Sequence, residues 1–311
     1  MTIRAAAKTI GFTKLGFRAR ARHFSPIDAD LKGRTLIVTG ATSGIGRSAV
    51  GQLAELGASI VIVGRNPDKT ARVRDEVITN GAVGEISFEI ADLAMMKSVR
   101  ALGARLLQRN EQIHVLINNA GTLFPDRGIT DEGVEQTLAT NLLSHFLLTN
   151  LLLERMKESA PARIINVSSG GMYTQRIRPG DLQYDKAAYD GSAAYARTKR
   201  GQVILTELWA ERLAADGIVV HAMHPGWADT PGLKSSLPGF RRLTKPVLRT
   251  PAEGADTIVW LAAASEAVES TGRFWLDRQS VPTHFFDSTK ETGRDRDLLW
   301  LRLGELAGSI C

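Results

Sequence analysis

From residue 35 onward, short runs of apolar and β-branched residues alternate with longer stretches of helical periodicity. The short runs, each predicted to be a buried strand, are Thr35–Thr39, Ser59–Val63, Ile86–Ile90, Val115–Asn118, Arg163–Val167, Val219–Met223 and a weaker one at Arg273–Leu276. The stretches with helical spacing are Arg47–Leu56, Pro67–Asn80, Met95–Arg109, Glu132–Ser159 and Tyr195–Ala214. Continuous apolar strands joined through helices are typical of a parallel sheet covered on both faces. The pattern therefore predicts an α/β fold with a doubly wound parallel sheet of about seven strands, with ligands at the carboxyl ends of the strands.

The alternation continues without an internal repeat, a low-complexity stretch or a linker, so we expect a single domain over residues 33–283. Within it, residues 228–249 mix leucine and phenylalanine with lysine and arginine, which predicts a lid over an apolar substrate or, alternatively, a surface loop. Residues 284–311 form a tail with an amphipathic helical pattern that can support a dimer, close the cleft or pack on the body. A homo-oligomer is the expected assembly.

The positive charge of the chain is concentrated in its first 32 residues. These carry seven Lys and Arg against two Asp, a net charge of +5, whereas the whole chain has a net charge of +6. The rest of the chain, from residue 33 onward, is therefore nearly neutral. Its net charge gives no reason to expect a nucleic-acid partner.

The basic extension, residues 1–32, also carries apolar residues such as Ile10, Phe12 and Phe17. Three alternatives stay open for it: a helix packed on the body, an amphipathic helix in a membrane interface, or a cleavable organelle-targeting segment. No apolar run approaches the ~20 residues of a membrane-spanning helix. The one cysteine, Cys311, excludes an intrachain disulfide and fits a reducing compartment. We therefore expect a cytoplasmic protein, with or without peripheral membrane contact.

A glycine-rich loop, "TGATSGIG" at residues 39–46, connects the first predicted strand to a helix. Gly40 permits the tight turn, Gly44 lets the backbone approach phosphates, and Gly46 lets the helix pack closely on the sheet. The N–H groups of the following helix favour a pyrophosphate. The loop, including Ser43 and Ile45, is thus predicted to bind a dinucleotide cofactor.

The second strand ends in Gly64, Arg65 and Asn66, where an NAD-preferring site usually has Asp or Glu. No carboxylate is present to repel a 2′-phosphate, and Arg65 can pair with one. Arg47, just after the glycine loop, adds a second positive charge. These residues favour NADP(H) over NAD(H), although a solvated loop charge remains the alternative for Arg65.

Tyr195 and Lys199 stand four residues apart, which places both on one helix face. Tyrosine at its ordinary pKa of about 10 is a poor base, and a neighbouring ammonium together with an oxidised nicotinamide is expected to lower that pKa. Ser168 and Ser169 follow the strand Arg163–Val167, where a hydroxyl can polarise a substrate carbonyl or simply cap a turn. Asn141, an amide within an apolar helical stretch, can break the helix locally and hold a water that relays protons to Lys199.

Together these motifs resemble the short-chain dehydrogenase/reductase family, the single-domain type with strand order 3-2-1-4-5-6-7. "TGATSGIG", "NNAG" at 118–121, Asn141, Ser169 and the Tyr195/Lys199 pair occur in the family's order, and the likeness covers roughly residues 33–276. The resemblance implies a catalytic tetrad of Asn141, Ser169, Tyr195 and Lys199, with Ser169 favoured over Ser168.

The resemblance also implies most of the cofactor contacts. In the family, residues at the positions of Asp92 and Leu93 contact the adenine, and Thr230 of "HPGWADT" is placed for the nicotinamide carboxamide. The complete set of expected cofactor-binding residues is Gly40, Ser43, Gly44, Ile45, Gly46, Arg65, Asn66, Asp92, Leu93, Asn119, Ala120, Gly121, Tyr195, Lys199, Pro225, Gly226 and Thr230.

Longer stretches such as "VSSGGM" and "GRFWLDRQSVPTH" are similar to a member of this family near its retinol-dehydrogenase-like branch. As in that branch, an insertion, residues 173–193, separates Ser169 widely from Tyr195 and is expected beside the substrate cleft. The resemblance implies an oxidoreductase that interconverts a carbonyl and an alcohol, and Arg65 with Arg47 favours NADP(H) as its cofactor. The apolar residues of the expected lid indicate a lipid-, steroid- or retinoid-like substrate.

Two other functions and a metal site are weighed against this interpretation. An NADP(H)-binding sensor or scaffold does not need the proton relay, and a nucleotide-sugar epimerase or dehydratase would carry a larger C-terminal domain than the tail after residue 276. His221 and His224 lie three residues apart with no cysteine nearby, so we expect structural histidines and no metal.

Overall fold

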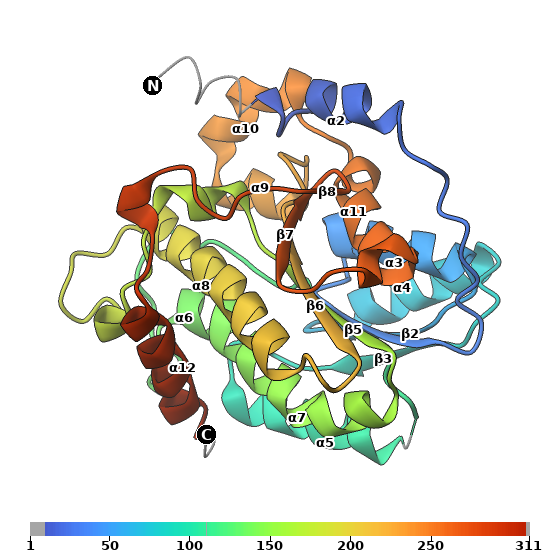
Figure 1. Ribbon diagram of the computed structural model, residues 1–311, viewed down its shortest axis with the longest axis horizontal. Coiled ribbons are helices and arrows are strands. Elements are labelled where there is room, and N and C mark those ends of the chain that lie inside the picture. The colour runs from blue at the N-terminus through green and yellow to red at the C-terminus, as the bar shows by residue number, and fades with distance from the viewer. Residues whose placement is uncertain (1–9, 110, 309–311) are drawn as a thin grey trace.

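The computed structural model describes residues 10–109 and 111–308 of the chain (Figure 1). Its one sheet has eight strands in the order β3-β2-β1-β4-β5-β6-β7-β8. The strands are β1 Thr35–Thr39, β2 Ser59–Gly64, β3 Ile86–Ile90, β4 Val115–Asn118, β5 Ala162–Val167, β6 Ile218–Met223, β7 Arg273–Leu276 and β8 Gln279–Ser280. The predicted parallel order is confirmed, and only β8, which pairs antiparallel with β7, is additional. Two exposed residues leave no hydrophobic pattern from which β8 could be predicted.

Each central strand buries side chains on both faces of the sheet. In β1, Leu36 and Val38 join the core under α3 (Gly44–Glu55), α4 (Pro67–Thr79) and α11 (Pro251–Ala263). Ile37 points the other way, into the core under α5 (Met96–Gln108), α7 (Ser144–Glu158) and α8 (Gly191–Arg212). The result is a three-layer arrangement whose helices cover both faces of the sheet, as expected from the continuous apolar strands.

The helix expected over Glu132–Ser159 differs from the prediction at its start. Gly133, at φ +78°, lies in a turn closed by a hydrogen bond from Thr130 N to Val134 O at 2.8 Å. The helix begins only at α6 (Gln136–Leu138), passes through a π-helical turn at Ala139–Leu143 and continues as α7. The π-helical turn contains Asn141, the residue at which the sequence indicated a local break of the helix.

Both terminal segments lie against the body. In the N-terminal segment, α2 (Lys14–Ala21) buries Phe17, and Phe12 just before it is also buried. At the other end, α12 (Gly293–Ala307) begins with a capping box of Thr292 and Asp295 and buries Leu299 and Leu303 beside α7 and α8. Figure 1 shows α2 next to the lid helices at one end of the molecule and α12 along α8.

The lid region forms two short helices, α9 (Pro231–Ser236) and α10 (Pro238–Thr244). Short 3-10 turns occur at Gly170–Thr174, Pro179–Asp181, Lys245–Val247, Glu266–Val268 and Asp287–Thr289. None of the helices in the described ranges has the length and apolarity needed to cross a membrane.

Candidate active site

The glycine loop carries the chain from the carboxyl end of β1 into α3. Gly40 has φ +65°, and a Cβ there would lie 2.6 Å from the Ala120 Cα, so both conformation and space require glycine. Gly44, at φ +56°, opens α3, and the Ser43 side chain before it makes no capping hydrogen bond. The first N–H groups of α3 are therefore available to an anion such as a pyrophosphate.

The "NNAG" turn is clamped to this loop. Asn119 donates its side-chain amide to Thr39 O at 2.8 Å and to Gly40 O at 3.1 Å. In return, the Thr39 hydroxyl accepts from the backbone N–H groups of Asn119 and Ala120 at 3.0 and 3.1 Å. A Cβ on Gly46 would collide with the Asn119 amide, which explains glycine at that position. Two motifs about 80 residues apart in sequence thus form one rigid rim.

A cavity of about 670 Å³ opens at the carboxyl ends of the strands, where ligands bind in such sheets. Its lining runs from the glycine loop past Ser169 and Tyr195 to the lid residues Leu237 and Phe240. Every residue expected to bind cofactor or act in catalysis lines this cavity except Asn66 and Asn141. A dinucleotide fits the glycine rim and the free helix terminus, and these are the residues that would hold it.

Asn66 and Arg47 have other partners in the structure. The Asn66 side chain caps α4 by accepting from Lys69 N at 2.9 Å, so it lies outside the cavity lining. Arg47 is paired with Glu76. Arg65, by contrast, lines the cavity with a side chain that is 75% exposed, 3.9 Å from the Asp92 carboxylate. Among these three, only Arg65 lines the cavity.

Tyr195 and Lys199 sit on the first turns of α8, which Asp190 caps. The Lys199 side chain is buried, and its ammonium lies 5.5 Å from the centre of the Tyr195 ring and donates to Val167 O at 2.9 Å. Burial lowers the pKa of Lys199 to about 7. Burial also raises the pKa of Tyr195, and a hydrogen bond with the Ser169 hydroxyl acts in the opposite direction. The expected lowering of the tyrosine pKa by the ammonium is therefore not found in the protein alone.

The two serines after β5 point to different partners. Ser168 is buried and donates its hydroxyl to Lys199 O at 2.8 Å, so it fixes the position of α8. Ser169 is partly exposed in the cavity, hydrogen-bonds Tyr195 and accepts from Gly171 N at 3.2 Å. Only Ser169 can contact both the tyrosine and a molecule in the cavity.

Asn141 lies in the π-helical turn, where a local break of the helix was expected. Its side chain accepts from Thr122 N at 2.8 Å and donates to Thr122 O at 2.8 Å. Its backbone carbonyl accepts from Gln202 at 2.9 Å. A Cβ on Gly121 would lie 3.0 Å from Lys199 Nζ and 3.4 Å from Asn141 Oδ1, so these two polar groups converge on Gly121.

The two histidines that stood three residues apart are held by separate partners. His221 accepts from Trp275 Nε1 at 3.0 Å and faces Ala267 O at 2.9 Å. His224 Nδ1 accepts from Gly170 N at 3.0 Å, and burial lowers its pKa to about 3. No group of three or more His, Cys, Asp or Glu that could hold a metal occurs within residues 10–109 and 111–308.

Several large apolar side chains line the cavity, among them Trp227, Phe240, Leu237, Leu233 and Phe124. Of the insertion, residues 173–193, only Thr174 and Ser192 reach the lining, so most of it lies away from the cleft. The sequence reasoning missed Trp227 and Phe124 as wall residues because neither lies in a hydrophobic pattern that marks a cavity.

Similarity to known proteins settles the family. Residues 34–239 match the short chain dehydrogenase family. The chain is a member of that family. It is 38% identical over 276 residues to dehydrogenase/reductase SDR family member 12 of Homo sapiens, covering 88% of this chain and 86% of that one. Retinol dehydrogenase 12 of Bos taurus is 37% identical over 252 residues, or 80% and 79% of the two chains. The predicted family and branch are confirmed.

Solved structures agree with this assignment. A Beutenbergia cavernae protein whose crystal structure contains NADP at low occupancy superposes on this short-chain dehydrogenase with a TM-score of 0.65. The two chains are 27% identical, with 80% of this chain and 96% of the other covered. The short-chain dehydrogenase is thus an oxidoreductase with a Rossmann-type fold.

Proposed function

We propose that this short-chain dehydrogenase interconverts a carbonyl and an alcohol on a hydrophobic substrate, with NADP(H) as the preferred cofactor. The observation that carries the proposal is the hydrogen bond between Ser169 and Tyr195, which line the same cavity as the glycine loop and the apolar residues of the lid. A bound nicotinamide would supply or take up the hydride there.

The chain's own residues handle the oxygen and its proton. The Ser169 hydroxyl holds the substrate oxygen, and the Tyr195 hydroxyl donates a proton to that oxygen in reduction or accepts it in oxidation. A raised pKa keeps Tyr195 protonated in the protein alone, which suits a proton donor. Lys199, with a pKa of about 7, can pass a proton toward Tyr195 near neutral pH. Asn141 donates to the Thr198 hydroxyl at 3.2 Å and so helps to position the turn of α8 that carries Lys199.

The preference for NADP(H) rests on Arg65. It is the exposed cation at the end of β2, and that strand ends in Gly64 rather than a carboxylate. Replacing Arg65 with Gln should weaken NADPH binding about tenfold or more with little effect on NADH, because one charge-assisted phosphate contact is lost. Arg72→Gln, an exposed arginine of α4, is the matched control. Equal loss of NADPH and NADH affinity would remove the case for Arg65.

The direct test of the activity follows NADPH consumption with a panel of hydrophobic aldehydes and ketones, using Tyr195→Phe as the control. Turnover that the variant abolishes supports the proposal. NADPH binding without turnover, followed by silence with NADP⁺ and lipid or retinoid alcohols, would instead favour an NADP(H)-binding sensor or scaffold. A reaction with sugar nucleotides alone would favour the epimerase alternative.

Peripheral membrane contact is a further part of the proposal. The docked N-terminal segment leaves Ile10 and Leu15 about 60% exposed, beside the basic residues Lys14 and Arg22. Co-sedimentation with anionic vesicles that Leu15→Glu abolishes would support it, and equal binding to neutral vesicles would contradict it. The homo-oligomer and the cytoplasmic location stay predictions, testable by light scattering and by imaging the full chain.

A further inference from the structure

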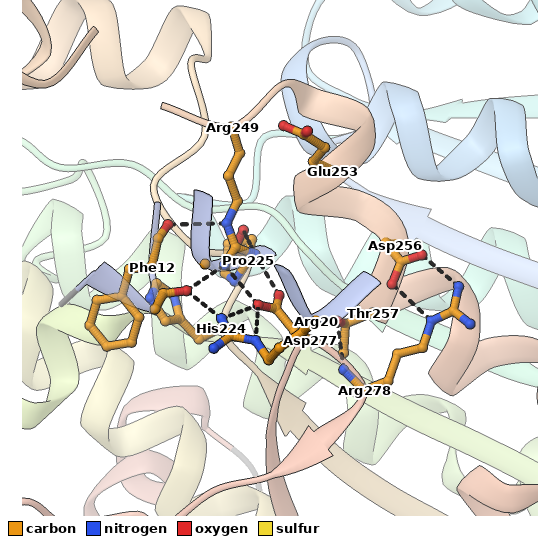
Figure 2. Close-up of polar contacts among 12 residues, drawn as sticks. Phe12, Arg20, His224, Pro225, Arg249, Glu253, Asp256, Thr257, Asp277 and Arg278 are labelled. Carbon is orange, nitrogen blue, oxygen red and sulfur yellow. Dashed lines mark hydrogen bonds and ion pairs between the residues drawn. The ribbon is translucent and has the colours of Figure 1, made fainter. Parts of the chain in front are cut away.

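The N-terminal segment, residues 10–24, lies outside the matched family region but is anchored at the rim of the active site (Figure 2). The fully buried guanidinium of Arg249 donates to Phe12 O at 3.0 Å, to Gly11 O at 2.8 Å and to both carboxylate oxygens of Asp277. Arg20 of α2 bonds the same carboxylate from the other side. Two parts of the chain more than 200 residues apart are thus locked together by a buried polar cluster.

This anchor puts the Phe12 ring directly behind the wall of the cavity. Phe12 is 6% exposed, and its ring centre lies 4.5 Å from that of His224 and 6.1 Å from that of Trp227. Trp227 N also donates to Phe12 O at 2.8 Å. His224 and Trp227 line the cavity, whereas Phe12 lies outside the lining. Phe12 therefore touches the wall without touching the cavity.

Trp227 contacts both Phe12 and the lid. Its ring centre lies 5.2 Å from that of Phe240 in α10, with the ring planes at 89°. Gly170, His224 and Phe12 are also closely packed. A Cβ on Gly170 would lie 2.7 Å from His224 Nε2 and 3.1 Å from the Phe12 ring. Gly170 directly follows Ser169, so the Phe12 ring supports both the substrate wall and the loop that carries this hydroxyl.

We propose that Phe12 is a specificity-determining residue, which limits the size of the substrate cavity by holding Trp227 and His224 from behind. The proposal rests on the proposed carbonyl/alcohol activity. Without the Phe12 ring, the indole of Trp227 can retract into the space left behind and the cavity widens. One extra or missing methylene group of a substrate in an apolar pocket changes kcat/KM by roughly 10–200-fold. The substrate preference of a variant without the Phe12 ring should therefore shift toward bulkier carbonyls by about tenfold or more.

The test is a graded series in the full chain: Phe12→Leu, Phe12→Val and Phe12→Ala. The measured quantity is the ratio of kcat/KM for a cyclohexyl ketone to that for a short linear ketone, with NADPH. The ratio should rise as the side chain shrinks, with KM for the bulky ketone falling and NADPH affinity unchanged. The series keeps the proposal testable if the alanine variant fails to fold.

Phe24→Ala is the matched control. It removes a ring from the same segment, but that ring packs on Phe17 and Arg278, away from the cavity. A ratio that stays constant across the Phe12 series, or that Phe24→Ala shifts equally, would overturn the proposal.

Hydrogen exchange of the peptide covering residues 222–230 provides a readout that needs no turnover. Faster exchange in Phe12→Ala, with wild-type exchange in Phe24→Ala, supports the role of Phe12 in holding this wall even if no carbonyl is reduced and the proposed activity fails. Identical exchange in Phe12→Ala and wild type overturns the inference whatever the activity.

Discussion

The ion pair between Asp277 and Arg249 allows a quantitative prediction, because each side chain is only 1% exposed. The Asp277 carboxylate accepts from Arg249 at 2.6 and 2.9 Å and from Arg20 Nε at 2.8 Å. Burial lowers the pKa of Arg249, and its hydrogen bond with Asp277 raises it again. One carboxylate thus compensates a fully buried guanidinium and a second, partly buried one (Figure 2).

Asp277→Asn keeps the side-chain shape, removes the charge and replaces one of the two accepting oxygens with an N–H donor. Asp277 has φ +51°, a conformation that asparagine tolerates well, so the substitution adds no backbone strain. Removing one partner of a buried ion pair costs about 3–5 kcal/mol because the other charge is left uncompensated. At about 2 °C per kcal/mol for a domain of this size, the thermal midpoint should fall by roughly 6–10 °C.

Asp256→Asn is the matched control for the thermal and urea unfolding measurements. Asp256 bonds Arg278 through both oxygens at 2.6 and 2.9 Å, but these side chains are 17% and 13% exposed and keep access to water. Its loss should cost about 1–2 kcal/mol. Equal losses of unfolding free energy for the two variants would refute the reasoning that burial of Arg249 sets the cost.

Three further predictions concern groups at the cavity. Burial lowers the pKa of Lys199 from 10.5 to about 7, so the folded protein binds fewer protons between these pH values and its stability rises with pH across this window. Lys199→Met should therefore raise the thermal midpoint more at pH 6 than at pH 10, and a pH-independent gain would contradict this. Gly226→Ala should cost about 3 kcal/mol or more, because a Cβ at φ +74° collides with Arg249, whereas Gly33→Ala, at φ +75° with open space, should cost about 1 kcal/mol; similar losses would be inconsistent with the collision. Ser169→Ala should lower kcat by about 10²–10³ with NADPH affinity intact, whereas Ser168→Ala should mainly lower stability by about 1 kcal/mol, and the reverse pattern would exchange their roles.

The strands were predictable because each has its own short run of apolar residues in the sequence. Thr35–Thr39, Ile86–Ile90 and Val115–Asn118 were placed with the observed ends, since each is a short apolar run next to a turn. Helix starts were less predictable. The expected start at Glu132 was wrong because the turn at Gly133 has no hydrophobic signature of its own.

In the candidate site, too, local motifs were predictable from the sequence, whereas contacts between distant residues were not. The glycine loop and the Tyr195/Lys199 pair are local motifs, and the order of the other motifs around them was enough to identify them in the sequence. The packing of Phe12 behind Trp227 depends on Arg249, a partner 237 positions from Phe12, and no local pattern connects them. The opposite surroundings of Ser168 and Ser169 likewise depend on how α8 lies over β5, which is a property of the fold.

The central claim is that Tyr195 handles the proton of the substrate oxygen in an NADPH-dependent reduction. The most direct test compares kcat/KM of wild type and Tyr195→Phe for a hydrophobic aldehyde, after NADPH affinity has been measured for both. The account predicts equal NADPH affinity and a loss of kcat/KM of about 10²–10⁴ in the variant. Undiminished turnover in Tyr195→Phe would contradict it.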